Sequence, residues 1–241
     1  AEFASPTLFA ELPVAKQDAE GRILYRDALR DALADEMRRD RRVIFYGEDV
    51  ADYGGAFKVT LGFQEEFGPW RVIDMPLAET AILGAATGSA FMGMRPVAEI
   101  MFCDFVGVCL DQIVNHAAKQ RYMSGGATHV PLTVRTVAGG GIGGFGAQHS
   151  QSTEALLLHT PGLKIVYPST PTEAKGLLLS CIFDEDPCIQ FESMMLTYAL
   201  REEVPLGDYR IPLGVAKVKR EGSDISLITY GWQVMHCLKA A

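Results

Sequence analysis

Hydrophobic residues in the first third of the chain follow a helical spacing and then a strand-like run. Leu29, Leu33 and Met37 recur every four residues, with charged side chains between them, which predicts an amphipathic surface helix over 25–39. The apolar run 43–46 follows and ends at Gly47, which is typical of a buried strand leading into a loop. The chain therefore starts its ordered part with a helix and a strand.

The same alternation continues to about residue 191. We expect strands at 72–74, 97–100, 132–137, 164–167 and 188–191, and helices at 80–94, 104–122, 153–159 and 173–183. Asp104 is expected to cap the second of these helices, and Gly125 and Gly126 to end it. Apolar strands separated by helix-length segments predict an α/β fold, a parallel sheet with helices on both faces.

The two ends of the chain differ from this central part. Residues 1–20 contain prolines and no sustained period, which indicates an N-terminal arm, and 21–198 is the expected main domain. The polar, proline-punctuated stretch 199–212 is typical of a linker. Residues 213–241 contain two β-like runs, 214–219 and 225–230, and a helical start, so we expect the start of a second α/β domain, truncated or completed elsewhere.

Composition narrows the classes of partner. The 241 residues are 48% hydrophobic, which is enough for a full core, and 22 basic against 30 acidic side chains give a net charge of -8. A phosphate backbone would be repelled by that charge, so nucleic acid is excluded as a partner. The apolar stretch 80–94 is too short to span a bilayer and no secretory signal is visible, so we expect a cytoplasmic protein that is not in a membrane.

Cysteine and histidine spacing argues against a structural metal site. The five cysteines lie in apolar runs without a C-x-x-C pair, and the five histidines form no H-E-x-x-H helix. We therefore expect buried free thiols and no zinc.

A glycine-rich run follows the predicted strand 132–137. Gly141, Gly143 and Gly146 match G-x-G-x-x-G, the fingerprint of dinucleotide binding. The fingerprint also requires a helix that opens inside the glycines and an acidic residue about 20 positions further on, and neither is present. NAD binding therefore stays a minor alternative, and we expect these glycines to allow close approach of a ligand or another segment.

Two side chains stand at places where chemistry is expected. Glu79 precedes the small-residue helix 80–94, where a carboxylate either interacts with the helix dipole or shares a proton with a ligand nitrogen. His149 is either a hydrogen-bonding scaffold or the acid–base group of the expected crevice. The sequence contains neither a G-x-S-x-G nor a G-x-x-x-x-G-K-[ST] motif, so hydrolase and phosphate-loop functions lose their support.

Ordered sequence blocks from Tyr25 onward carry a family resemblance. They are Gly47-Glu48-Asp49-Val50, 53–60, Pro76-Leu77-Ala78-Glu79, 95–99, 111–115, 121–126, Gln148-His149-Ser150-Gln151 and 161–164. With these blocks the chain resembles the β subunit of the thiamine-diphosphate-dependent decarboxylating component of 2-oxo acid dehydrogenase complexes, of the pyruvate, branched-chain and acetoin kind. The resemblance implies that 21–198 is a pyrimidine-binding domain of the transketolase-like fold.

It also implies roles for five residues. Glu79 would bond the ring nitrogen of the cofactor's aminopyrimidine and activate thiamine diphosphate, and Phe105 would stack on that ring. Leu77 would contribute a main-chain contact, and Glu48 would belong to a proton path between paired active sites. His149 would orient the substrate or intermediate and help transfer the acyl unit to lipoamide.

The resemblance further implies several ligands and partners. Main-chain oxygens of Leu132, Cys181, Asp184 and Asp186 would hold a potassium ion. The family holds the diphosphate and magnesium through a G-D-G motif on an α subunit, and this chain has no G-D-G. We therefore expect an α subunit in an α2β2 heterotetramer, a lipoyl-bearing acyltransferase and a small 2-oxo acid, first of all pyruvate. Branched-chain 2-oxo acids, acetoin and a non-catalytic partner-binding scaffold remain alternatives.

Overall fold

A single parallel sheet forms the centre of the molecule. The computed structural model describes residues 16–141 and 144–241. The sheet has six strands in the order β3-β2-β4-β5-β7-β6, and every neighbouring pair is parallel. The strands are β2 (Val43–Gly47), β3 (Val72–Asp74), β4 (Arg95–Phe102), β5 (Thr133–Ala138), β6 (Lys164–Val166) and β7 (Cys188–Ser193). The predicted parallel α/β sheet is confirmed.

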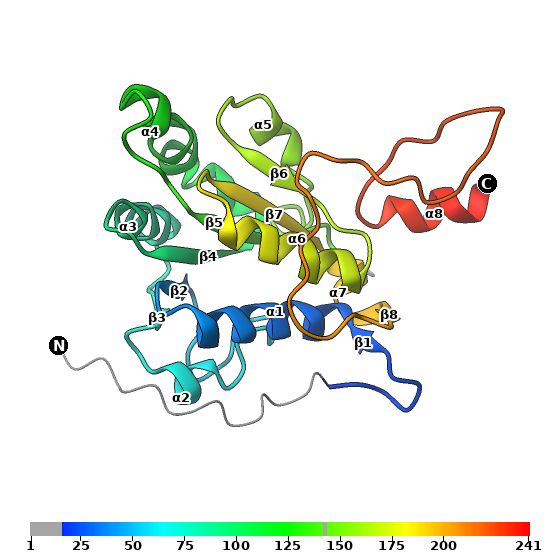
Figure 1. Ribbon diagram of the computed structural model, residues 1–241, viewed down its shortest axis with the longest axis horizontal. Helices are drawn as coiled ribbons and strands as arrows, with labels where there is room; N and C mark the ends of the chain where they lie inside the picture. The colour runs from blue at the N-terminus through cyan, green and yellow to red at the C-terminus, as the bar shows by residue number, and fades with distance from the viewer. Residues whose placement is uncertain (1–15, 142–143) are drawn as a thin grey trace.

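Helices cover both faces of this sheet (Figure 1). One layer consists of α1 (Tyr25–Arg39), α2 (Phe63–Phe67), α6 (Pro171–Phe183) and α7 (Met194–Ala199). The other consists of α3 (Glu79–Phe91), the 3-10 turn η1 (Cys103–Gly107), the π-helical segment η2 (Gln112–Ala117), α4 (Ala118–Met123) and α5 (Glu154–Leu158). Two separate apolar clusters, one in each layer, make up most of the core, which is the reason why both faces of the strands are apolar.

Helix α1 is more deeply buried than a surface helix. Its buried set includes the polar residues Asp27 and Glu36 as well as its apolar face. It packs against α6 and α7, and Arg39 at its end forms an ion pair of 3.2 Å with Asp208 of the later chain. The prediction of a helix is confirmed, but its placement at the surface was wrong because later segments cover its polar side.

The helix predicted over 104–122 is not continuous. The structure has η1, then η2, then α4 in its place. The main-chain oxygen of Val108 accepts a hydrogen bond of 2.9 Å from the Thr80 hydroxyl of α3. In a continuous helix over 104–122 this oxygen would accept its hydrogen bond from within the helix. Asp104 makes no cap hydrogen bond for η1 and bonds Gln151 instead.

The last part of the chain is mostly irregular in this structure, and the start of a second α/β domain at 213–241 stays a prediction. No strand forms in residues 203–241, and the predicted β runs 214–219 and 225–230 were wrong for this structure. Val215, Val218, Ile225 and Ile228 are exposed there, because two short runs with no sheet to join cannot bury an apolar face. The expected helix is present as α8 (Gln233–Ala240).

The predicted linker lies against the main domain. Tyr209 donates a hydrogen bond of 2.7 Å to the main-chain oxygen of Thr172, and Ser180 donates one of 2.6 Å to that of Ile211. A β-carbon on Gly176 would lie 2.7 Å from Tyr209 and 2.8 Å from Ile211, so only glycine allows this approach to α6.

A short antiparallel pair precedes this segment. Strands β1 (Ile23–Leu24) and β8 (Arg201–Glu202) join the two ends of the main domain. Of the predicted arm 1–20, residues 1–15 lie outside the described residues.

Candidate functional site

The strand order creates a crevice at one edge of the sheet. The chain leaves β2 towards β3 on one side and leaves β4 towards β5 on the other, so the direction reverses between β2 and β4. In open α/β sheets, ligands bind outside the carboxyl ends of the strands at such a point. Glu48 follows β2, Glu79 begins α3 after β3, and Phe105 follows β4. The structure thus brings three of the predicted site residues to one crevice.

Glu48 and Glu79 form the acidic part of this crevice. The Glu48 side chain is buried, and burial raises the pKa of its carboxyl group to about 7, with further contributions from the negative charges of Glu79, Asp49 and Glu99. A backbone hydrogen bond from Ala78 acts in the opposite direction. Glu48 is therefore a carboxyl group that can hold a proton near neutral pH beside a second carboxylate.

The segment that leads from β3 into α3 is tied to the loop after β2. The main-chain N–H of Met75 donates a hydrogen bond of 2.8 Å to the carbonyl oxygen of Gly47, and that of Val50 donates one of 2.9 Å to the Asp74 carboxylate. Burial and the neighbouring charge of Glu79 raise the pKa of the Cys109 thiol to about 12. Glu79 therefore lies between the loop after β2 and the end of η1, and Leu77 just before it is 85% exposed.

His149 lies against two phenylalanine rings at the carboxyl end of β4. Its ring centroid is 5.1 Å from those of both Phe102 and Phe105, in edge-to-face geometry. His149 and Phe105 are half-buried, so each keeps a face towards solvent or a ligand. His149 and Phe105, which the sequence singled out separately, are thus in direct contact. Their positions in the sequence did not indicate this contact.

Further aromatic residues extend this cluster, and sequence reasoning missed them. Phe102 contacts Phe57 at 5.4 Å and Phe145 at 6.0 Å between ring centroids. Phe57 and Phe145 come from two different loops, one after β2 and one in the glycine-rich run. One pattern in the sequence could have indicated this cluster: Phe102 and Phe105 lie on either side of Asp104 at the end of a predicted strand. Aromatic side chains at the carboxyl end of a strand are typical of the lining of a ligand crevice.

The glycine-rich run is approached by a distant segment of the chain. Gly139, Gly140 and Gly141 line a cavity of about 670 Å³ together with Glu154, residues 228–230, Trp232 and Gln233. The Tyr230 hydroxyl donates a hydrogen bond of 2.9 Å to Glu154 across it. No helix begins in the described part of the glycine-rich run, because α5 starts only at Glu154. The helix that a dinucleotide-binding fingerprint requires is therefore absent from these described residues. Gly143 lies outside the described residues.

The residues predicted for potassium lie at the opposite edge of the sheet. Leu132 precedes β5, and Cys181, Asp184 and Asp186 lie at the end of α6 and before β7. All four main-chain oxygens already accept hydrogen bonds, from Cys188, Asp184, Arg95 and the Cys188 thiol respectively.

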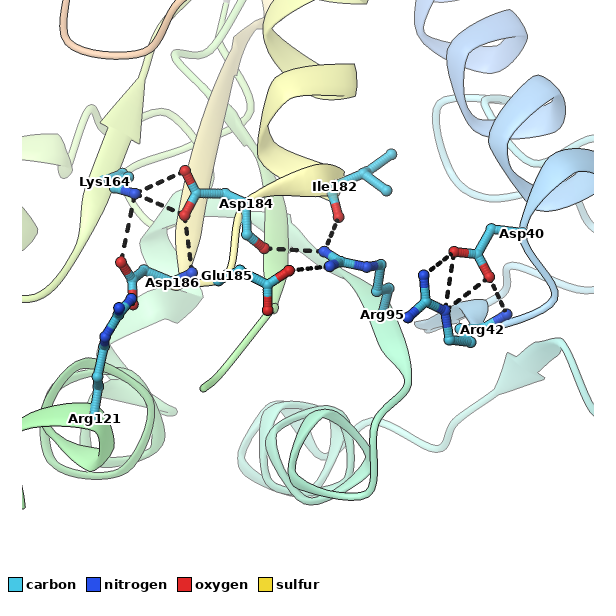
Figure 2. Close-up of polar contacts among 9 residues, drawn as sticks. All are labelled: Asp40, Arg42, Arg95, Arg121, Lys164, Ile182, Asp184, Glu185 and Asp186. Atoms are coloured by element: carbon cyan, nitrogen blue, oxygen red, sulfur yellow. Dashed lines mark hydrogen bonds and ion pairs between the residues drawn. The ribbon is translucent and has the colours of Figure 1, made fainter. Parts of the chain in front are cut away.

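Figure 2 shows that cationic side chains also surround this turn. Lys164 Nζ lies 2.7 Å from both oxygens of Asp184, Arg121 lies 2.7 Å from Asp186, and Arg95 pairs with Glu185. Arg121 and Lys164 hold the pKa of Asp186 below its usual value, although its partial burial acts in the other direction. The turn carries its own positive charges, so its oxygens fit an added potassium ion poorly, and the proposed function does not use potassium.

Residues 16–141 and 144–241 contain no group of three or more His, Cys, Asp or Glu side chains placed to hold a metal ion. No helix in the same ranges is long and apolar enough to cross a bilayer.

Comparison with known proteins agrees with the motifs. The 2-oxoisovalerate dehydrogenase subunit beta of Bacillus subtilis is 50% identical over 217 residues, which are 90% of this chain and 66% of that protein. The pyruvate dehydrogenase E1 component subunit beta of Staphylococcus epidermidis is 48% identical, over 89% of this chain and 66% of its own length. The acetoin:2,6-dichlorophenolindophenol oxidoreductase subunit beta of B. subtilis is 47% identical, with the same shares. The chain thus spans slightly less than two thirds of these relatives.

Solved structures support the fold. A split-gene transketolase, described as an inactive beta4 tetramer, superposes with a TM-score of 0.71 at 21% identity, over 90% of this chain and 65% of that one. Transketolase from Leishmania mexicana gives 0.59 at 19% identity, over 81% and 28%. The family model described as "Transketolase, pyrimidine binding domain" matches residues 22–198, which hold the whole parallel sheet and every residue of the crevice. This chain belongs to the family of transketolase pyrimidine-binding domains.

Proposed function

We propose that this chain is the β subunit of a thiamine-diphosphate-dependent 2-oxo acid dehydrogenase and supplies the pyrimidine half of the cofactor site. The observation that carries the proposal is that Glu48, Glu79 and Phe105 all follow strand ends at the crevice between β2 and β4, with Glu79 near enough to raise the pKa of Glu48. The 47–50% identity to the three β subunits supports the same class of reaction.

The residues of the crevice fit an aminopyrimidine ring. Glu79 is half-buried at the first turn of α3, where a carboxylate can accept a hydrogen bond from a protonated ring nitrogen or share its proton. Phe105 offers a half-buried aromatic face, and Leu77 lies in an exposed loop that a ligand can reach. Glu48 Oε1 is buried and has no hydrogen-bond partner among the described residues, so a donor from a ligand or a partner chain would satisfy it.

Glu79 and Glu48 supply the proton chemistry in this proposal. When bound, thiamine diphosphate would supply a nucleophilic carbon and an electron sink for decarboxylation of the 2-oxo acid. Glu79 holds a proton at the pyrimidine ring nitrogen, and Glu48 next to it exchanges a proton close to neutral pH, as its raised pKa allows. His149 orients the 2-oxo acid and helps to transfer the acyl unit to lipoamide.

The diphosphate and magnesium come from a partner in this proposal. The crevice has no cluster of basic side chains among the residues named, and the sequence lacks G-D-G. An α subunit holds them, the pair assembles as α2β2, and a lipoyl-bearing acyltransferase receives the acyl group. The three relatives differ by only three percentage points in identity, so pyruvate, branched-chain 2-oxo acids and acetoin are all substrates to test.

Reconstitution with an α subunit tests the proposal. Calorimetry with thiamine diphosphate and magnesium is done on this chain alone and on the co-expressed pair, followed by turnover of pyruvate, 3-methyl-2-oxobutanoate and acetoin. We expect binding by the pair only. Glu79→Gln abolishes turnover without changing the thermal midpoint, whereas Glu65→Gln, an exposed acid on α2, leaves turnover unchanged. Full turnover by Glu79→Gln contradicts the role of Glu79, and a pair that binds no cofactor favours the scaffold alternative.

A further inference from the structure

Gln151 joins two segments at the carboxyl edge of the sheet. Its main-chain N–H and its side-chain amide donate hydrogen bonds of 3.3 and 2.8 Å to the same carboxylate oxygen of Asp104. Its carbonyl oxygen accepts a hydrogen bond of 2.8 Å from the N–H of Gly139 and one of 3.2 Å from the Cys103 thiol. We call the contact between Asp104 and Gln151 the carboxylate latch.

The latch closes the loop that carries His149. The described segment 144–151 ends at Gln151, and its glycines at 144 and 146 have positive φ, a conformation that glycine adopts without strain. Inside the loop, Ser150 accepts a hydrogen bond of 2.8 Å from the N–H of Phe145. The latch, two residues after His149, joins this segment to η1 through a carboxylate, beside the hydrogen bonds that Cys103 makes with Gln151 and Thr153.

The other end of the latch lies between the aromatic partners of His149. Phe102 and Phe105 flank Asp104 in the chain, and both contact the histidine ring. An edge-to-face contact alone holds a ring weakly, whereas hydrogen bonds to a carboxylate are short and directional. A single carboxylate therefore links the position of the His149 loop to that of the Phe105 ring.

We propose that Asp104 and Gln151 are positioning residues that hold His149 against Phe105 in one orientation. The catalytic consequence rests on the proposed function, because only there does His149 act on the substrate or the acyl group. The geometric consequence is independent of the proposed function. Without the latch, the His149 ring leaves its two phenylalanine partners and becomes more reactive.

The test compares two substitutions at one position in the α/β complex. Asp104→Ala removes the acceptor, while Asp104→Asn keeps a carbonyl oxygen that can accept both bonds from Gln151. Carbethoxylation of His149 by diethyl pyrocarbonate is followed by peptide mass, and acyl transfer to lipoamide and decarboxylation with an artificial oxidant are measured alongside.

We expect Asp104→Ala to speed carbethoxylation of His149 several-fold and to slow acyl transfer roughly 10- to 100-fold, with little change in KM for the 2-oxo acid, because a misplacement of about 1 Å has effects of that size. Asp104→Asn restores both measurements towards wild type. Asp40→Ala, which removes a carboxylate bonded to Arg42 at the opposite edge, controls for general destabilisation and leaves His149 reactivity unchanged.

Unchanged His149 reactivity in Asp104→Ala overturns the proposal. If that variant does not fold, Gln151→Ala, at an exposed side chain, replaces it with the same expectations. A wild-type complex that decarboxylates none of the substrates refutes the proposed function, and the carbethoxylation rates then still decide whether the latch positions His149.

Discussion

Arg135 and Glu192 form a paired, two-bond contact beneath the crevice, with two N···O distances of 2.7 Å, on strands β5 and β7. A third bond of 2.8 Å links Arg135 to Glu99 on β4. All three side chains are at least 96% buried, so three neighbouring strands are tied by a charge network with one excess negative charge. Burial raises the pKa of Glu99 despite the positive charge of Arg135.

Removal of the shared cation is expected to be strongly destabilising. Arg135→Met leaves two buried carboxylates without their partner and lowers the free energy of unfolding by about 3–5 kcal/mol. Urea denaturation of wild type and variant at the same pH measures the difference. Arg135→Lys, which keeps the charge but cannot make the two-bond contact, should recover only part of the loss. A loss below about 1 kcal/mol would show that the network contributes little.

Glu48 makes stability depend on pH in a defined direction. Its pKa is about 7 in the folded chain and 4.5 without the fold, so the folded state binds more protons between these values. The contribution of Glu48 is complete below pH 4.5 and is lost as the pH rises through 7. Its size is at most about 3 kcal/mol, less where water reaches the edge of the sheet.

Glu48→Gln should therefore flatten the pH profile of stability. Thermal or urea unfolding of both chains from pH 4 to 8 provides the comparison. Because Glu79, Asp49 and Glu99 all raise the pKa of Glu48, Glu79→Gln should shift the same fall in stability to lower pH. Parallel profiles for wild type and Glu48→Gln would contradict the assignment.

Two glycines with positive φ form a matched pair for a backbone test. Gly162 has φ of 94°, and a β-carbon there would overlap the main-chain oxygen of Ala118. Gly207 has φ of 81° with open space around it. We expect Gly162→Ala to lower the free energy of unfolding by more than about 3 kcal/mol and Gly207→Ala by about 1 kcal/mol. Equal losses in chemical denaturation would mean that α4 and the loop before β6 can move apart easily.

The turn before β7 should be insensitive to potassium. Its carboxylates already contact Lys164, Arg121 and Arg95. Exchange of potassium chloride for tetramethylammonium chloride at equal ionic strength is expected to shift the thermal midpoint by less than about 2 °C, since a bound ion that is lost lowers stability by its binding free energy. A larger fall on removal of potassium, and a still larger one in Lys164→Met, whose turn has lost a competing cation, would establish the ion site that the family resemblance implies.

The sequence by itself determined the α/β class, the parallel sheet and the positions of its main helices and strands. Hydrophobic period depends on local spacing, so it predicted β2 and α6 to within a few residues. Ordered motifs also determined the family, and they singled out Glu48, Glu79, Phe105 and His149. These results need no knowledge of which segments meet in space.

Tertiary structure decided the order of the strands and everything that depends on it. The reversal between β2 and β4, which makes the crevice, is a property of the crossovers and leaves no local pattern. The latch joins residues 47 positions apart, and the network of Arg135 joins three strands, so neither appears in any window of sequence. The predicted β runs after residue 213 form no strands in this structure. A strand exists only where a neighbouring strand offers hydrogen bonds, and this too depends on tertiary structure.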